Sequence, residues 1–140
     1  MLNITRANEL FCAFHQVTYN FIMTLSDYNA FCQTLPASDQ VVQWGGMDVW
    51  KVGGKLFAMA REKDGVFQVT FKATDIGYEV MSDMEGLRPA PYLASRGMKW
   101  IQHYAAPGLD DAGLREHIQL SYEMAIKRLT KAKRAELGLT

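Results

Sequence analysis

The sequence predicts an α+β fold centred on an antiparallel sheet, and three observations lead to that class. Two runs rich in β-branched and aromatic residues meet at Gly53-Gly54, where both glycines suit the positive φ angles of a two-residue hairpin turn. A third such run, 66–72, follows the turn signal Asp64-Gly65. Segments with helical spacing stand before and after these runs. We therefore expect a three-stranded meander over residues 48–72, flanked by helices.

The segment before the meander is expected to form one helix and one short strand. Thr24 or Ser26 offers a hydroxyl that can cap a helix running to Leu35, and Pro36 stops that helix. Its apolar side chains share one stripe at helical spacing: Leu25, Tyr28, Phe31, Cys32 and Leu35. We interpret Cys32 as a small core residue. A short strand is expected over 41–44.

The segment after the meander is expected to begin with a second helix. Thr74 is its predicted cap and Gly86 its predicted end, in the left-handed position. The predicted buried stripe of this helix comprises Ile76, Val80, Met81 and Met84. A shaped loop follows over 86–99, with a very short strand expected at 92–93.

The C-terminal part is expected to contain one more strand and the longest helix. Residues 98–104 alternate as a strand does, and Asp110 or Asp111 caps a helix that runs to Leu129. A last helical turn is expected over 131–137, where cations outnumber acids on a solvated helix end. The full order is α-β(3)-α-β(2)-α, with a three-stranded meander plus short strands.

Composition favours a single globular domain. The chain has 140 residues, of which 49% are hydrophobic and 21% charged, enough for a hydrophobic core. Residues 1–22 carry weak signals, whereas Met23 begins a stretch that looks like a natural start followed by a helix. We therefore expect 1–22 to be an N-terminal extension outside the core and 23–140 to be one domain.

Charge and cysteine usage exclude several classes of site. The 15 acidic and 15 basic residues cancel, so binding to nucleic acid requires a local patch of cations. The chain has only two cysteines, with no Cys-x-x-Cys pair and no cluster of cysteines with histidines, which argues against a disulfide framework and a zinc site. No apolar run approaches the length of a membrane span, so we expect no membrane association and a cytoplasmic location.

Pairing the strands residue by residue predicts two faces of the meander. The turn at 53–54 places Trp50 opposite Phe57, and a four-residue loop at 62–65 places Arg61 opposite Val66. The expected core face comprises Val49, Lys51, Leu56, Ala58, Ala60, Phe67, Val69 and Phe71. The expected outer face mixes aromatic rings with cations and comprises Trp50, Val52, Lys55, Phe57, Met59, Arg61, Gln68, Thr70 and Lys72. A one-residue bulge in the second hairpin would move the third strand to the opposite face.

No catalytic signature occurs in the chain. It lacks a phosphate-binding loop, a dinucleotide fingerprint, a nucleophile elbow and a zinc-protease motif. Its three histidines, His15, His103 and His117, are scattered and are expected to be exposed or hydrogen-bonded. We therefore expect neither an enzyme nor a cofactor.

The stronger signal is a set of cations interleaved with aromatic residues around the sheet and the loop. Cations neutralise phosphates, and flat rings stack on bases. The predicted nucleic-acid-binding residues are Lys51, Lys55, Lys72, Arg88, Arg96, Lys99, Trp50, Tyr92 and Trp100. Tryptophans also fill cores, and strand lysines also protect sheet edges from aggregation.

The same stretches resemble the MmcQ/YjbR family of small bacterial proteins. The matching pieces are Val-Val-Gln-Trp-Gly-Gly at 41–46, Val-Trp-Lys-Val-Gly-Gly-Lys-Leu-Phe-Ala at 49–58, Phe-Lys at 71–72, Arg-Pro-Ala-Pro-Tyr at 88–92, Trp100, and Ser-Tyr at 121–122. The resemblance covers roughly residues 23–130 and leaves out the expected extension. It implies an α+β fold in the order given above.

The resemblance also implies DNA binding by a double-wing arrangement. In this chain the Gly53-Gly54 hairpin and the 86–99 loop would be the wings that straddle the DNA backbone. We expect a low affinity, about 10⁻⁴ to 10⁻⁶ M, and a monomer or weak homodimer. Two alternatives remain at this stage: a protein-interaction module that uses the Trp50–Phe57 face, and a small-ligand pocket between the sheet and the loop.

Overall fold

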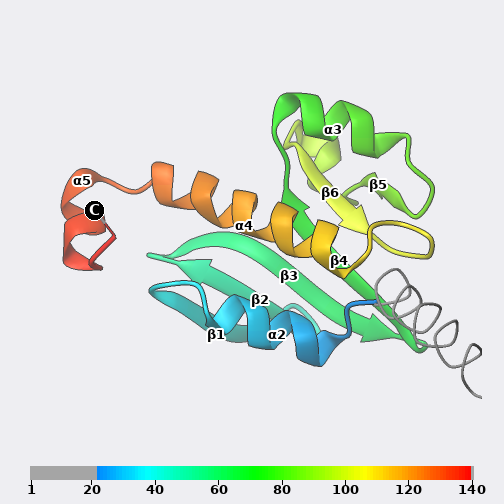
Figure 1. The fold of residues 1–140 in the computed structure, drawn as a ribbon. Coiled ribbons are helices and arrows are strands. Elements are labelled where there is room, and N and C mark those ends of the chain that lie inside the picture. Colours follow the sequence, from blue (N-terminus) through cyan, green and yellow to red (C-terminus); the bar gives the residue numbers. More distant parts are fainter. Residues whose placement is uncertain (1–21, 140) are drawn as a thin grey trace, which may run out of the picture.

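A computed structural model describes residues 22–139, so the predicted extension lies outside the described residues except for Ile22. Six strands form one antiparallel sheet in the order β1-β2-β3-β4-β6-β5 (Figure 1). The elements are α2 (Leu25–Gln33), β1 (Ser38–Gln43), β2 (Met47–Val52), β3 (Lys55–Lys63), β4 (Val66–Lys72), α3 (Asp75–Ser82), β5 (Leu87–Pro89), the 3₁₀ turn η1 (Ala94–Arg96), β6 (Trp100–His103), α4 (Asp111–Lys127) and α5 (Lys131–Glu136). The predicted α+β class is confirmed.

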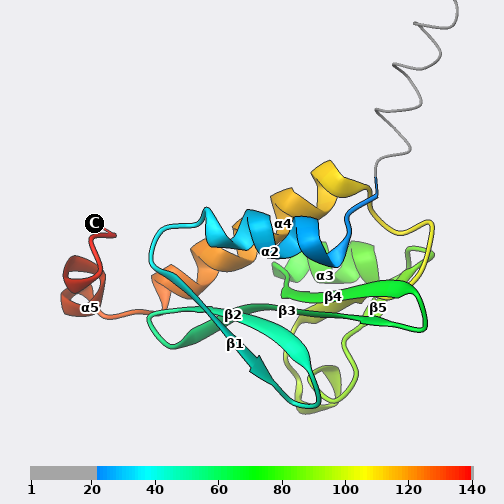
Figure 2. The ribbon, with the colours of Figure 1, turned by 90° about the horizontal axis from the view of Figure 1, so that it is seen from below.

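The helices α2 and α4 cover one face of the sheet, and α3 lies beside β5 and β6 (Figures 1 and 2). We call this the helix face. The opposite face, which we call the open face, has no long helix on it. Instead the β1–β2 hairpin turn and the segment between β5 and β6 project on that side (Figure 2). Within residues 22–139, no helix has the length and apolarity that a membrane span needs.

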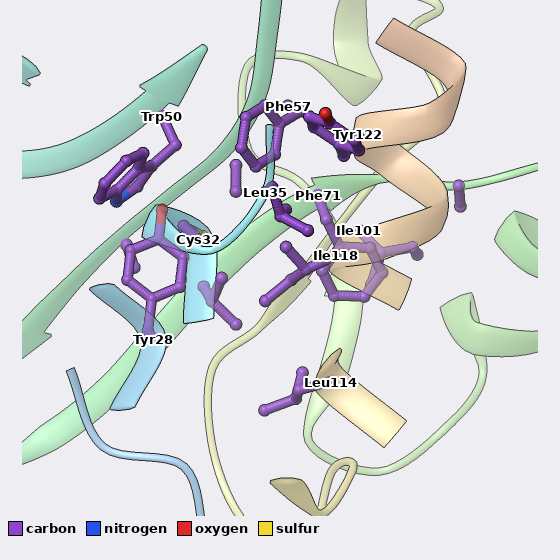
Figure 3. Close-up of a cluster of buried hydrophobic side chains, with 14 of the residues drawn as sticks. Tyr28, Cys32, Leu35, Trp50, Phe57, Phe71, Ile101, Leu114, Ile118 and Tyr122 are labelled. Carbon is purple, nitrogen blue, oxygen red and sulfur yellow. The ribbon is translucent and has the colours of Figure 1, made fainter. Parts of the chain in front are cut away.

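The core lies between the sheet and the helices α2 and α4 (Figure 3). Tyr28, Phe57, Phe71, Leu114 and Ile118 are all less than 2% exposed. Burial of each large apolar side chain stabilises the fold by about 1.5–3 kcal/mol, so this layer supplies most of the stability. Cys32 is buried here as predicted, and burial raises the pKa of its thiol, which keeps it protonated and unreactive.

The first hairpin differs from the predicted pairing by one residue. Its turn is as predicted, since Gly53 and Gly54 both have positive φ and Val52 pairs with Lys55. The register then shifts at a bulge, so Trp50 pairs with Ala58 and not with Phe57. Because Phe57 is the extra residue, the side chains on β2 change faces relative to the prediction.

The predicted faces are therefore wrong for the first half of the meander. Trp50, Val52 and Phe57 belong to the buried cluster on the helix face. Three residues that were predicted to face the core lie on the open face instead: Val49, Lys51 and Leu56. For the rest of the meander the predicted core face is confirmed, because its members lie in or against the buried cluster: Ala58, Ala60, Phe67, Val69 and Phe71.

The second hairpin has a shorter loop than predicted. Lys63 pairs with Val66, so the turn contains only Asp64 and Gly65, both with positive φ. Arg61 consequently pairs with Gln68. The pairing of β4 with β3 is therefore shifted by two residues from the predicted pairing. Because two is an even number, each side chain of β4 stays on its predicted face.

Ser121 of α4 joins the helix to the sheet beside the bulge. Its hydroxyl donates to the carbonyl of Phe57 at 2.7 Å and accepts from the backbone N–H of Lys72 at 3.0 Å. The next residue, Tyr122, packs edge-on against Phe57 with ring centroids 5.2 Å apart. Ser121 therefore satisfies backbone groups at the position where the bulge interrupts the sheet, and Tyr122 packs against the bulge residue itself.

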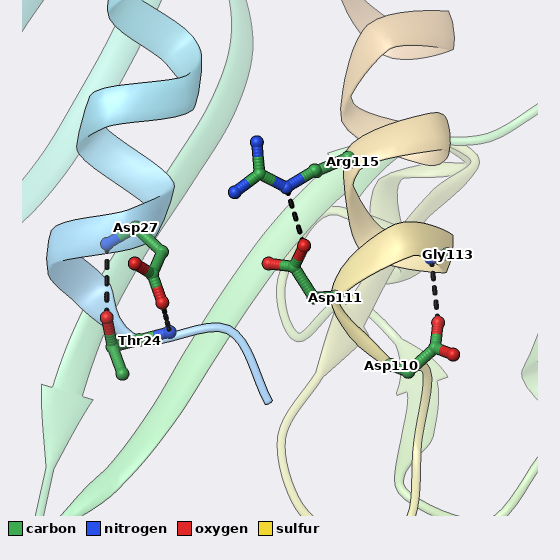
Figure 4. A network of polar contacts seen from close by, with 6 residues as sticks. All are labelled: Thr24, Asp27, Asp110, Asp111, Gly113 and Arg115. Atoms are coloured by element: carbon green, nitrogen blue, oxygen red, sulfur yellow. Dashed lines mark hydrogen bonds and ion pairs between the residues drawn. The ribbon is translucent and has the colours of Figure 1, made fainter. Parts of the chain in front are cut away.

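The predicted helix caps are confirmed at three positions, and Figure 4 shows two of them, Thr24 and Asp110. The hydroxyls of Thr24 and Thr74 and the carboxylate of Asp110 each accept a backbone N–H in the first turn. Asp27 returns a bond to the N–H of Thr24, which completes a capping box. Asp111 instead pairs with Arg115 one turn along α4.

Two predictions for the segment after the meander are wrong. Ile76 and Val80 are 76% and 58% exposed, so of the predicted stripe in α3 only Met81 is fully buried. The strand expected at 92–93 does not form, and β6 pairs with β4 on one side and with β5 on the other. The helix α3 is short and packs mainly against β5 and β6 at the end of the sheet. Only one side of this helix is therefore buried.

Candidate nucleic-acid interface

A cleft of about 600 Å³ lies on the open face. Strands β3 to β6 supply its floor, the β1–β2 turn supplies one rim, and the segment 90–96 supplies the other. We call it the arginine cleft. It is lined by Trp44, Met47, Leu56, Met59, Arg61, Thr70, Arg88, Ala90, Pro91, Tyr92, Leu93, Arg96 and Gln102.

Three arginines line this cleft, and two of them are held by glutamines on neighbouring strands. Arg61 donates from Nε to Oε1 of Gln68 at 3.1 Å, and Arg88 donates from Nε to Oε1 of Gln102 at 2.8 Å. Arg88 also lies 4.3 Å from the ring centre of Tyr104. These contacts restrict the two side chains before any ligand arrives.

The charge of the cleft is one-sided. No aspartate or glutamate is among the described residues that line it, and none of its arginines takes part in an ion pair there. A guanidinium presents several N–H donors in a planar fork that matches carboxylate and phosphate groups. The cleft is therefore suited to an anion, although the chain as a whole has no net charge.

The predicted site residues fall into four groups, and only the first lies in the cleft. That group is Arg88, Arg96 and Tyr92, which come together as the prediction required. Lys51 pairs with Leu56 and Lys72 follows Thr70 by two residues, so both belong to the open face outside the cleft lining.

Lys55 and Lys99 lie on the other side of the sheet. Lys55 pairs with Val52, a helix-face position. Lys99 is one residue before Trp100, and its Nζ lies 3.3 Å from a carboxylate oxygen of Asp75 at the start of α3. Neither lysine shares a surface with the arginine cleft.

Trp50 and Trp100 are buried, which contradicts their predicted availability for stacking. Trp50 is 5% exposed and donates from its indole to Oδ1 of Asn29 on α2. Trp100 is 2% exposed. Burial in close-packed surroundings prevents either ring from presenting a face to a base.

Among the lining residues that were not predicted to bind, one is a cation and one is an exposed aromatic residue, Arg61 and Trp44. Arg61 had been placed on the outer face but not among the binding residues. Trp44 is 59% exposed and directly precedes Gly45-Gly46 at the tip of the β1–β2 hairpin. A large aromatic residue beside a flexible pair of glycines is the signal that pointed to an exposed ring.

The predicted first wing, the Gly53-Gly54 hairpin, does not line the cleft. An added Cβ on Gly53 would lie 2.8 Å from a methyl of Leu129 and 3.1 Å from one of Leu137, so the β2–β3 turn packs against the C-terminal segment. The hairpin that faces the 90–96 loop across the cleft is β1–β2. Two projecting segments do border one surface, and these are the β1–β2 turn and the segment 90–96.

A second cavity, of about 730 Å³, lies at the other end of the molecule beside His103. His103 is 6% exposed, so it is buried and not at the surface, and among residues 22–139 no side chain or backbone group lies in good hydrogen-bond geometry with its ring nitrogens. Burial lowers the pKa of this imidazole and favours its neutral form. In the part of the chain that the structure describes, no group of His, Cys, Asp and Glu side chains is arranged to hold a metal ion.

Comparison with known proteins gives a family and a fold. The model of the YjbR family matches residues 33–124. The chain is similar to the crystal structure of Deinococcus radiodurans protein DR2400, a DUF419-domain protein, with a TM-score of 0.73 and 24% identity over 85% of this chain and 91% of that one. It is also similar to a Pseudomonas syringae protein, with a TM-score of 0.61 and 13% identity over 74% and 99%. Both likenesses concern the fold, and no curated protein matches.

Proposed function

The chain belongs to the YjbR family, and from its open face we propose that it is a non-enzymatic protein that binds DNA through the arginine cleft. One observation carries the proposal: Arg61, Arg88 and Arg96 line a single cleft that contains no carboxylate. Phosphate is an anion that this arrangement suits, because a guanidinium can donate two parallel bonds to it.

The positions of the glutamines support this proposal. Gln68 and Gln102 each accept from an arginine Nε, which leaves the terminal amino groups of Arg61 and Arg88 directed to other partners. A restrained guanidinium loses less conformational entropy when it binds than a mobile one does. Lys51 and Lys72 extend the cationic surface beyond the cleft on the same face of the sheet.

The salt dependence of binding follows from the number of cations. Three to five phosphate contacts predict a slope of log K against log salt of about −3 to −4.5 on duplex DNA and about −2 to −3.5 on single strands. Because the net charge of the chain is zero, we expect affinities of about 10⁻⁴ to 10⁻⁶ M.

The test is fluorescence anisotropy of labelled DNA with the full chain at about 50 and 200 mM salt. The variant Arg61→Ala/Arg88→Ala/Arg96→Ala should lose measurable binding. A matched variant, Lys127→Ala/Arg128→Ala/Lys131→Ala, removes the same charge from the cationic C-terminal region and should bind as the unmodified protein does. Loss of binding in the second variant but not in the first would contradict the proposal.

A small anionic ligand is a second candidate, favoured by the volume of the cleft. About 600 Å³ lies within the range of pockets that hold small molecules. Binding that is independent of DNA length, and is competed by a mononucleotide, would favour this candidate. The protein-interaction alternative loses its main surface, because Trp50 and Phe57 are 5% and 0% exposed.

A further inference from the structure

We propose that Trp44 and Tyr92 bracket one unpaired base over the arginine cleft, so that the protein prefers single-stranded to duplex DNA. This inference rests on the proposed function and specifies the form of DNA that the same cleft takes. It starts from two aromatic residues that line the cleft from two separate segments, Trp44 on the β1–β2 turn and Tyr92 on the segment between β5 and β6.

Both rings are left in water. Trp44 is 59% exposed and Tyr92 is 85% exposed, whereas Trp50 and Trp100 are at most 5% exposed. Tyrosine and tryptophan at binding surfaces supply a flat face with few rotatable bonds, and base–aromatic stacking uses that face irrespective of base identity. In the described part of the fold, more than half of the surface of each residue is exposed, so both rings can be reached by a ligand.

The backbone at both rings is in the left-handed region. Trp44 has φ of 47° and Tyr92 has φ of 71°, and the other described non-glycine residues with positive φ are Ala37 and Asp64. Bulky residues rarely adopt this conformation, and such outliers concentrate at ligand sites. Ser95 helps to hold the second rim, since its hydroxyl donates to the carbonyl of Tyr92 at 2.8 Å.

The shape and charge together select an unpaired base. In a duplex each base is stacked between its neighbours, so neither of its faces can meet a protein ring. A single strand can place one base between the rims while its flanking phosphates lie on Arg61, Arg88 and Arg96.

The test uses the full chain and three probes at about 50 mM salt: a thymidine oligomer of about ten residues, the same length of abasic backbone, and a duplex of equal length. The oligomer should bind about tenfold or more tightly than the abasic strand. It should also quench tryptophan fluorescence and protect it from iodide, because Trp44 is the most exposed of the three tryptophans.

Variants separate the rings from the phosphate contacts. Trp44→Ala and Tyr92→Ala should each weaken binding of the oligomer about tenfold and leave the abasic strand and the duplex unchanged. Trp44→Phe and Tyr92→Phe, which keep a ring, should retain most of the affinity. Ile76→Ala truncates another exposed apolar side chain, on α3 outside the cleft, and should change nothing.

The outcomes distinguish this inference from the proposed function. Equal binding of the oligomer, the abasic strand and the duplex would overturn base capture and leave phosphate binding intact. Failure of all three probes to bind would overturn both. A thermal midpoint measured for each variant shows whether it folds. If an alanine variant does not fold, the phenylalanine variants are compared with the unmodified protein instead.

Discussion

The two faces of the sheet come from the same strands but have different chemistry. On the helix face, Phe57, Val69 and Phe71 are fully buried against α2 and α4. On the open face, neighbouring residues of the same strands, such as Arg61 and Gln68, form polar pairs beside a cleft. The difference indicates that one face supplies stability and the other remains available for binding. Each prediction below tests that division.

The largest effect is expected from truncating the bulge residue. Phe57→Ala removes a fully buried ring that packs on Tyr122, and it should lower the free energy of unfolding by about 3–5 kcal/mol. Met59→Ala, two residues along on the open face, should cost clearly less, because Met59 is only partly buried. Urea denaturation measures both. Equal costs would contradict the assignment of the faces.

A smaller loss is expected when the helix–sheet connection is removed. Ser121→Ala leaves the carbonyl of Phe57 and the N–H of Lys72 without their partner, and it should cost about 1–3 kcal/mol. Ser82→Ala is the matched control, because the hydroxyl of Ser82 only donates within its own helix, to the carbonyl of Tyr78. If the two serine variants unfold at the same urea concentration, the bridging role of Ser121 is wrong.

On the open face the expected effect is on binding. Arg88→Ala should weaken DNA binding about fivefold to tenfold and make the salt slope shallower by about 0.7–0.9, since one phosphate contact is lost. Its cost in stability should stay below about 1 kcal/mol, the scale of its contact with Tyr104. Arg88→Lys keeps the charge but not the bond from Nε to Gln102. Its affinity, measured by anisotropy, should therefore lie between those of the unmodified protein and of Arg88→Ala.

The smallest effect concerns pH and belongs to the helix face. Burial lowers the pKa of His103 and of His117, so the unfolded chain binds more protons than the folded chain just below the ordinary pKa of about 6.5. The stability from the neutral imidazoles is complete above that pH and is lost as the pH falls below it. Thermal midpoints from about pH 7 to 5 should decline, and less steeply in His103→Leu. A midpoint that rises over this range would contradict the burial of neutral imidazoles.

Much of the fold was predictable because its signals are local. Hydroxyl and carboxylate caps identified the starts of α2, α3 and α4, and paired glycines identified the first hairpin turn. The pairing of β5 with β6 was not predictable in the same way. The three residues of β5 include a proline, and they form a strand only because β6 offers them an edge.

The candidate site was predicted only in part, and the bulge is the main reason. Residues 56–60 are an unbroken apolar run, so alternation could not reveal that Phe57 is an extra residue. Trp50 was therefore assigned to the wrong face. The arginines of the cleft were easier to place, because Arg88 and Arg96 belong to a loop region whose prolines and glycines already indicated a shaped surface.

The central claim is that DNA lies on the arginine cleft of the open face. The most direct measurement is a titration of the ¹⁵N-labelled full chain with a short single-stranded oligomer, followed by amide and arginine Nε chemical shifts. The account predicts the largest changes at 44–47, at 88–96 and at the Nε groups of Arg61 and Arg88, with none at Leu25–Gln33. Changes centred on the cationic segment Lys131–Glu136 would contradict it.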